Sequence, residues 1–172
     1  SGQQNVFVGA QSGDAITTGE NNTSVGQGSL ANDDVGLGSV AIGTQAMTFQ
    51  NTASATYTLN TAVGFQSLYY NVTGQQNTTL GYRAGFGSVS GASVSGLTAI
   101  GYHAGYNNQT GVYNVHIGMQ AGYGAASNSA NTNTFVGYKT GYDVTSGYNN
   151  VALGGSALEN LTSGYDNVVI GN

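Results

Sequence analysis

Hydrophobic and polar positions repeat along this chain with a period of about 17 residues, as in a repeat protein, and a glycine marks each repeat. The residue before that marker glycine is always Val, Ile or Leu, and the residue three positions before it is always Val or Thr. Side chains two positions apart share one face of a β-strand, and β-branched residues favour strands. Each repeat is therefore predicted to hold a short strand ending at its marker glycine: Gly9, Gly26, Gly43, Gly64, Gly81, Gly101, Gly118, Gly137, Gly154 and Gly171.

Repeats of nearly constant length indicate a solenoid, in which each repeat forms one turn and packs on its neighbours. The high glycine content and the period of two exclude helices. We predict a single all-β domain over residues 1–172, a parallel β-solenoid or β-roll of about ten turns. The spacing of the marker glycines is constant except at three longer junctions, between Gly43 and Gly64, between Gly81 and Gly101, and between Gly118 and Gly137.

The apolar residue before each marker glycine is predicted to point into a continuous core. The third residue after the glycine is Ser, Ala or Thr in every repeat that reaches that far, and such small side chains let two layers of backbone approach closely. This pattern predicts a thin, flat roll with two short strands per turn. The predicted core residues are Val8, Val25, Ile42, Val63, Leu80, Ile100, Ile117, Val136, Leu153 and Ile170.

Asparagine stands four positions before the marker glycine in eight repeats. Amides stacked at the strand spacing of about 4.8 Å can donate to carbonyls of a neighbouring turn and form a ladder, although asparagine also tolerates turn conformations. At the regular junctions a second glycine, such as Gly74, stands seven positions before the marker, where we predict a bend with positive φ. The predicted ladder residues are Asn5, Asn22, Asn60, Asn77, Asn114, Asn133, Asn150 and Asn167.

Consecutive repeats carry an aromatic residue five positions after the marker glycine. Aromatic rings on adjacent turns stack and stabilise one another, which is a structural explanation of this column. Stacking of a carbohydrate on the rings is the other interpretation, and it makes them candidate surface or ligand-binding residues. The column consists of Tyr69, Phe86, Tyr106, Tyr123 and Tyr142.

The longer junctions fall in segments 47–59, 86–96 and 123–132, which are rich in Ser, Thr, Ala and Asn. Insertions in a solenoid form loops, often on the edge that binds a partner. We therefore predict that these segments lie on one edge and are its most exposed loops. Neutral tolerance of short insertions explains the same pattern without any binding role.

The composition excludes several classes of protein. The chain contains 39% hydrophobic residues at a fixed phase, which is unlike a disordered chain, and it has no cysteine for a thiol-based metal or redox site. Arg83 and Lys139 are the only cations in a chain of net charge −5, so no basic patch is available for nucleic acid or a membrane surface. Apolar runs long enough to cross a bilayer are also absent from the sequence.

Candidate catalytic or metal-binding residues are sparse. The seven acidic residues are scattered, and His103 and His116 fall at different positions of the repeat, so the sequence predicts no enzyme, no metal site and no cofactor. Sequons at Asn71, Asn108 and Asn160 fall in the connection after the aromatic column and are candidate glycosylation sites.

Two units, at residues 60–68 (NTAVGFQSL) and 150–158 (NVALGGSAL), carry a resemblance to a known family. They resemble the head repeats of trimeric autotransporter adhesins and related repeats of phage tail fibres, and the similarity extends over the whole chain. It implies a left-handed, homotrimeric β-roll with two short strands per turn, used for surface attachment. The repeat unit of this chain is longer than the one typical of those heads.

These observations predict an extracellular structural or adhesive fibre segment on a cell or virion surface, with a surface glycan or a host receptor as its partner. Self-association is expected as a homotrimer or as an end-to-end filament, because no capping helix, proline or charge cluster closes either end. A receptor-binding segment of a phage tail fibre is an alternative. An ice-binding solenoid is a second alternative, which needs a flat outward array of Thr, whereas the Thr positions are predicted to face inward.

Overall fold

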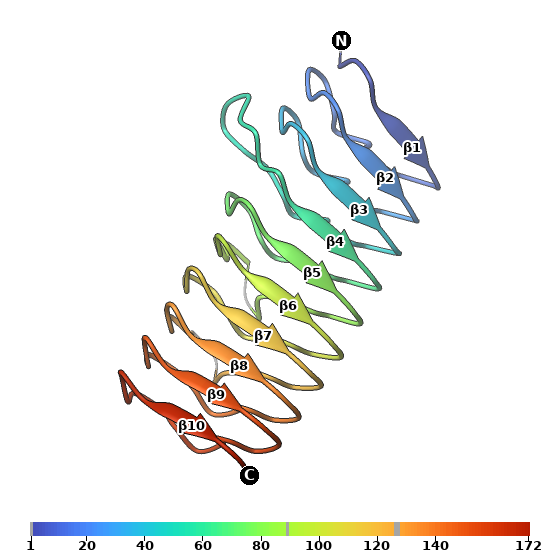
Figure 1. The fold of residues 1–172 in the computed structure, drawn as a ribbon. Coiled ribbons are helices and arrows are strands. Elements are labelled where there is room, and N and C mark those ends of the chain that lie inside the picture. The colour runs from blue at the N-terminus through green and yellow to red at the C-terminus, as the bar shows by residue number, and fades with distance from the viewer. Residues whose placement is uncertain (1, 89, 126–127) are drawn as a thin grey trace.

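The computed structural model describes residues 2–88, 90–125 and 128–172, and the chain winds into an elongated β-solenoid (Figure 1). Ten parallel strands form one sheet in sequence order, so the predicted parallel solenoid is confirmed. Each strand has three residues, and equivalent repeat positions are paired in register, as in Val8 with Val25. The strands are β1 (Val6–Val8), β2 (Thr23–Val25), β3 (Val40–Ile42), β4 (Thr61–Val63), β5 (Thr78–Leu80), β6 (Thr98–Ile100), β7 (Val115–Ile117), β8 (Thr134–Val136), β9 (Val151–Leu153) and β10 (Val168–Ile170).

The prediction of two strands per turn is wrong for the described part of the chain. Outside β1 to β10, parallel pairing is limited there to isolated bridges such as Leu37 with Tyr57. Between the strands, each turn contains residues in the left-handed region, which 20 described non-glycine residues adopt. Residues with positive φ bend the chain, and an extended strand cannot continue through them.

The inward face of the strands is opposite to the predicted one. The central residue of every strand from β2 to β9 is buried, whereas the residue before the marker glycine is partly or fully exposed in all ten turns. The thin interior accommodates one side chain per strand, and the flanking pair therefore points outward. The predicted core residues that prove fully exposed are Val8, Ile42, Leu80, Leu153 and Ile170, and those that are partly exposed are Val25, Val63, Ile100, Ile117 and Val136.

The real core is filled by two positions that compensate in size, namely the strand centre and the fourth residue after the marker glycine. Where the strand centre is small, as in Ala62, the fourth residue is large, as in Leu68, and both are fully buried. Where the strand centre is Phe135, the fourth residue is Gly141, and a Cβ on that glycine would collide with the ring. Close packing therefore favours one large side chain per turn. The fifth turn has only Thr79 and Gly85 at these positions, and Leu68 and Leu97 of the neighbouring turns reach this space.

The sixth turn departs from this pairing, but its core space is filled all the same. Both Ala99 and Gly105 are small there, and Leu97 replaces the usual asparagine of the ladder. Leu97 is 1% exposed, and its Cδ1 lies 3.7 Å from the position of a Cβ on Gly105. The leucine therefore fills the space that the other two positions leave.

The predicted asparagine ladder is confirmed. Its side chains lie inside the roll just before each strand; for example, Asn133 Nδ2 donates to the carbonyl of Gly147 at 2.8 Å. Asn133 Oδ1 accepts the backbone N–H of Asn150 at 3.0 Å, so each amide connects successive turns. These bonds satisfy backbone groups that the short strands leave unpaired.

The second glycine column has a different physical cause from the predicted one. These glycines do not have positive φ. Among the two glycine columns, positive φ is found at the marker glycines, with values between 126° and 139°. A Cβ on Gly19 would lie 2.6 Å from the carbonyl oxygen of Gly36, and one on Gly74 would overlap the carbonyl oxygen of Val94. Close approach of backbone between turns therefore requires glycine here.

Candidate interaction surfaces

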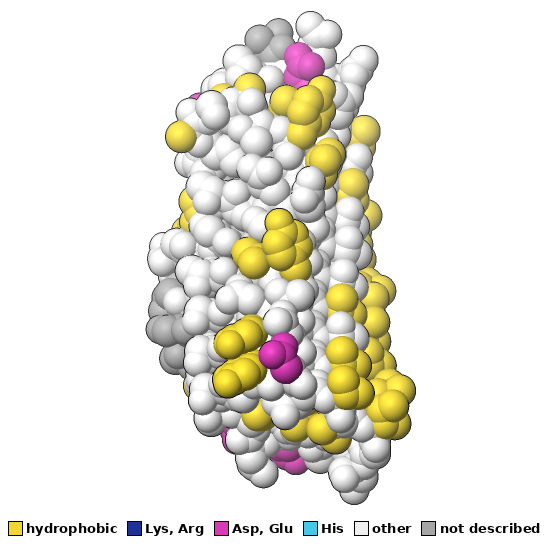
Figure 2. All heavy atoms as spheres, turned by 60° about the vertical axis from the view of Figure 1, so that its left-hand side comes forward, with side chains coloured by type: hydrophobic (Ala, Val, Ile, Leu, Met, Phe, Trp, Pro, Cys, Tyr) yellow, Lys and Arg dark blue, Asp and Glu magenta, His cyan; other side chains and the backbone are white. Residues whose placement is uncertain are grey.

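The outward residues of the strands form an uncharged apolar surface, which we call the sheet face. It consists of the first and third residues of β1 to β10, all of them Val, Ile, Leu or Thr. Figure 2 shows hydrophobic side chains in rows along the length of the molecule beside polar surface. At the parallel strand spacing of about 4.8 Å, the rows extend over about 45 Å. Apolar patches of this size on soluble proteins are often functional.

The aromatic column follows the marker glycines in the turn, and its rings stack on one another along the solenoid. Its ring centroids are between 4.9 and 5.4 Å apart, with interplanar angles between 2° and 11°. The flat faces of the rings are therefore covered by one another, and Phe86 is only 8% exposed. Burial also raises the pKa of Tyr69 and Tyr123 above 10. The geometry confirms the structural interpretation and leaves no ring face within the column for a sugar.

The cations Arg83 and Lys139 belong to this aromatic side. Arg83 Cζ lies 5.0 Å from the ring centroid of Phe86, and Lys139 Nζ lies 5.1 Å from that of Tyr142. Lys139 Nζ also lies 3.7 Å from a carboxylate oxygen of Glu159. Since the sequence contains no other Lys or Arg, the remaining surfaces carry no side-chain cation except where a histidine is protonated.

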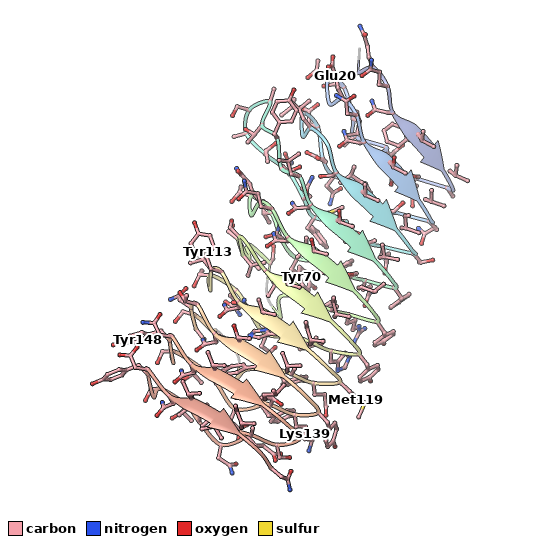
Figure 3. All side chains as sticks on the ribbon, in the orientation of Figure 1. Glu20, Tyr70, Tyr113, Met119, Lys139 and Tyr148 are labelled. Carbon is pink, nitrogen blue, oxygen red and sulfur yellow. The ribbon has the colours of Figure 1, made fainter. Side chains whose placement is uncertain are left out.

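A third surface lies where the chain enters each strand. We call it the entry edge, and it consists of the two residues that precede the asparagine position, with Tyr57 added where the fourth turn has a bulge. Figure 3 shows Glu20, Tyr113 and Tyr148 at this end of the turns, and Met119 and Lys139 at the other end. Its large exposed side chains are Tyr57 at 63%, Leu59 at 49%, Tyr113 at 66%, Tyr148 at 42% and Tyr165 at 58%.

Sequence reasoning missed these tyrosines because they stand at different offsets from the marker glycine. Tyr113 directly precedes its asparagine, whereas Tyr148 and Tyr165 stand two positions before theirs. The signal that could have found them is an aromatic residue within three positions of the ladder asparagine.

Among the described residues, the three longer junctions do not lie at one place on the roll, so that prediction is wrong there; residues 89 and 126–127 of these segments lie outside the described part of the chain. The extra residues of segment 47–59 follow the buried Gln50, and in Figure 1 they form the wide loop before β4. Gln50, Asn71 and Asn108 each stand seven residues after a marker glycine. Asn71 pairs with Ala92, and Asn108 pairs with Asn128, so the additional residues of the other two segments precede this position instead of following it. Parts of all three segments are buried, including Met47, Val94 and Ala130.

Two of the three candidate glycosylation sites are inaccessible. Asn71 and Asn108 are each 1% exposed, and Asn71 Nδ2 donates to the carbonyl of Gly74 at 3.0 Å. A glycan cannot be attached to an amide that lies inside the roll. Asn160 is exposed and stays a prediction.

The ionisable groups do not form a catalytic constellation in the described ranges. Groups of three or more His, Asp or Glu side chains that could hold a metal ion are absent from residues 2–88, 90–125 and 128–172. Asp33 is buried and accepts from Gln50 Nε2 at 2.8 Å, and burial raises its pKa. Burial and Arg83 lower the pKa of His103. In the same ranges no helix is long and apolar enough to cross a membrane.

His116 is the centre of β7 and has no hydrogen-bond partner within the described structure for either ring nitrogen. The ring stacks on Phe135 with centroids 5.5 Å apart, and it is fully buried. Burial lowers the pKa of His116 from 6.5 to about 4, because a charged imidazolium in this core has no solvation.

The stability of the protein is therefore expected to fall as the pH decreases from about 6.5 to about 4. In that window the unfolded state binds a proton at His116 that the folded state excludes, and the full loss is about 3 kcal/mol. Urea unfolding followed by circular dichroism between pH 4 and pH 7 measures this dependence. The variant His116→Phe places in β7 the residue that β8 carries at its centre, and it should remove this part of the pH dependence. An unchanged pH profile would contradict the prediction.

Comparisons with family models, curated proteins and solved structures gave no match for this chain. Its function is therefore argued from the three surfaces themselves.

Proposed function

We propose that the chain is a segment of a homotrimeric extracellular fibre, assembled through the sheet face and used for attachment to a surface. The observation that carries this proposal is the outward orientation of the aliphatic residues before the marker glycines. Ten strands of about 10 Å at a spacing of about 4.8 Å give an apolar area on the order of 450 Å² per chain. Burying such an area against another subunit removes it from water.

A second copy of the same chain suits the sheet face better than an unrelated partner. The face repeats one pattern at every strand, so only a partner with the same turn spacing matches it along the whole length. None of the residues of β1 to β10 is an acid or a base that carries charge at neutral pH, because His116 is buried and neutral. Copies with a net charge of −5 can therefore approach through this face without like charges meeting. The trimeric state is suggested by the resemblance to trimeric adhesin heads.

Acidic substitutions at the middle of the sheet face test the assembly. The variants Ile100→Asp and Ile117→Asp change side chains that are already partly exposed, so each chain should stay folded while its trimer dissociates into monomers. Sedimentation equilibrium measures the mass, and circular dichroism measures the fold. Asn160→Asp is the matched control, since Asn160 is exposed in the connection after the aromatic column, away from the strands, and this variant should remain trimeric.

A wild-type protein that stays monomeric at tens of micromolar would contradict the assembly. The end-to-end filament predicted from the sequence stays a prediction, and it would show in the same experiment as species heavier than a trimer.

Ice binding is a second candidate, favoured by one correction to the sequence analysis. The pattern predicts inward-facing Thr side chains, but five of the ten first positions of the strands carry outward-facing Thr in a straight array: Thr23, Thr61, Thr78, Thr98 and Thr134. A monomer that lowers the freezing point of its solution and shapes ice crystals would favour this function over the fibre. Loss of both effects in Ile100→Asp would locate them on the sheet face.

A further inference from the structure

The entry edge is a straight and stiff surface. Its backbone forms a second ladder along the solenoid, with Tyr113 N donating to Ser95 O at 3.0 Å, Thr132 N to Val112 O at 2.9 Å and Asn149 N to Asn131 O at 3.2 Å. Isolated parallel bridges join Asn131 to Tyr148 and Tyr148 to Tyr165 on the same edge. Side chains on this ladder are therefore held at defined spacings, although the edge contains no regular strand.

The tyrosines of the edge are more exposed than the rings of the aromatic column. Tyr113 is 66% exposed, and its ring lies over the backbone of Gly96, where a Cβ would be only 2.7 Å from Cδ1. Tyr148 and Tyr165 stack on each other with centroids 5.0 Å apart. Glycine at position 96 therefore lets an aromatic ring rest along the edge and present its other face outward.

The spacing and the chemistry of the edge fit an extended ligand. Tyr57, Tyr113 and Tyr148 precede β4, β7 and β9, so they are about 14 Å and about 10 Å apart along the axis at a strand spacing of about 4.8 Å. Amide and hydroxyl side chains separate them, among them Gln75, Gln76 and Thr132. Tyrosine interspersed with small polar residues is a composition that binding surfaces favour, since the rings supply area and the amides supply hydrogen bonds.

Charge narrows the class of ligand. The edge carries Glu20 and Asp166 and no Lys or Arg, because Arg83 and Lys139 lie on the aromatic side. Figure 2, which looks toward this edge, shows separate hydrophobic patches and acidic side chains amid uncharged polar surface. Polyanions such as nucleic acids and acidic polysaccharides are therefore disfavoured by repulsion.

We infer that the entry edge binds a neutral linear polysaccharide that lies along the solenoid, with sugar rings on Tyr57, on Tyr113 and on the outer faces of Tyr148 and Tyr165, which their mutual stacking leaves uncovered. Sugar rings offer apolar C–H faces to the tyrosines and hydroxyl groups to the intervening amides. This inference rests on the attachment role in the proposed function, for which it names the ligand class. It does not depend on the sheet face.

Affinity gel electrophoresis tests polysaccharide binding by the entry edge. Four separate gels contain mannan, laminarin, xyloglucan or, as the polyanion, polygalacturonate. The chain migrates freely because its net charge is −5. At least one neutral polysaccharide should retard the wild type, whereas polygalacturonate should not. The double variant Tyr113→Ser, Tyr148→Ser should bind roughly tenfold more weakly or worse.

Two further double variants serve as controls. Tyr113→Phe with Tyr148→Phe keeps the rings and should retain most of the retardation. Tyr102→Ser with Tyr138→Ser removes two tyrosines that are each 48% exposed next to the marker glycines, away from the entry edge, and should bind like the wild type. Thermal unfolding by circular dichroism checks that every variant is folded.

Several outcomes would overturn the inference: no retardation by any neutral polysaccharide, retardation by polygalacturonate alone, or unchanged binding by the serine variant. Dissociation of the oligomer in that variant would assign the edge to self-contact and would also overturn it. The monomeric Ile100→Asp variant separates this inference from the proposed assembly. Retardation of that monomer supports polysaccharide binding by the entry edge even if the fibre model fails. A wild-type trimer that is not retarded overturns polysaccharide binding and leaves the proposed assembly intact.

Discussion

Replacing Phe135 with alanine is expected to lower the free energy of unfolding by about 3–5 kcal/mol. Phe135 is fully buried at the centre of β8, where it is the large side chain of its turn. The thin roll offers no neighbouring layer that could move in to close the cavity. Urea unfolding followed by circular dichroism measures the loss.

A second substitution should restore much of that stability. Combining Phe135→Ala with Gly141→Leu recreates the small and large pair that Ala62 and Leu68 form in the fourth turn. Gly141 has a φ of 61°, close to the 54° of Leu68, so a leucine can adopt this backbone. Gly141→Leu alone should be strongly destabilising, because its Cβ would collide with the Phe135 ring.

The favourable coupling between the two sites, obtained from the double-mutant cycle, should exceed about 2 kcal/mol. Additive losses would show that the two positions do not share one space, contrary to the observed size compensation.

The substitution Gly74→Ala is expected to destabilise the protein by about 3 kcal/mol or to prevent folding. Its Cβ would overlap the carbonyl oxygen of Val94 in the next turn, and backbone on both sides prevents an easy adjustment. The φ of Gly74 is not positive, so the loss reports the contact between turns rather than backbone strain. Thermal unfolding followed by circular dichroism measures it.

Gly155→Ala is the matched control. Gly155 also lacks a positive φ, and its Cβ would lie 3.5 Å from Asn172 Oδ1, which is an ordinary contact. Its effect should stay within about 0.5 kcal/mol, or be slightly stabilising, because alanine restricts the unfolded chain. Equal effects of the two substitutions would contradict close backbone approach as the reason for glycine at position 74.

The proposed roles divide the surface of one turn between two kinds of contact. In this proposal, the first and third residues of each strand contact another subunit, and the residues before the ladder asparagine contact a ligand. Because the turn repeats along the axis, both surfaces extend over the length of the chain, as a fibre that attaches along its side requires. The aromatic column contributes stability through stacking.

Much of the fold could be predicted from the sequence, because each turn repeats the same local requirements. The spacing of the marker glycines indicated the number and length of the turns, and Asn133 with its equivalents indicated the ladder that the hydrogen bonds confirm. Parallel pairing in register follows from stacking identical units. These properties depend on residue identity at a fixed phase, which a sequence displays directly.

Only the tertiary structure decided which face of the strands is inside. A strand of three residues is too short to display alternation clearly, and Thr98 and Ile100 look as suitable for a core as Ala99 does. The width of the roll settles the choice, because its interior admits the single central residue and the fourth residue after the glycine, and it turns the aliphatic pair outward. The entry edge likewise exists only in three dimensions, since the stacking of the turns brings Tyr57, Tyr113 and Tyr148 to one edge although their offsets in the sequence differ. The sequence alone thus determined the repeat and its ladder, and the packing of the turns determined what remains on the surface to meet other molecules.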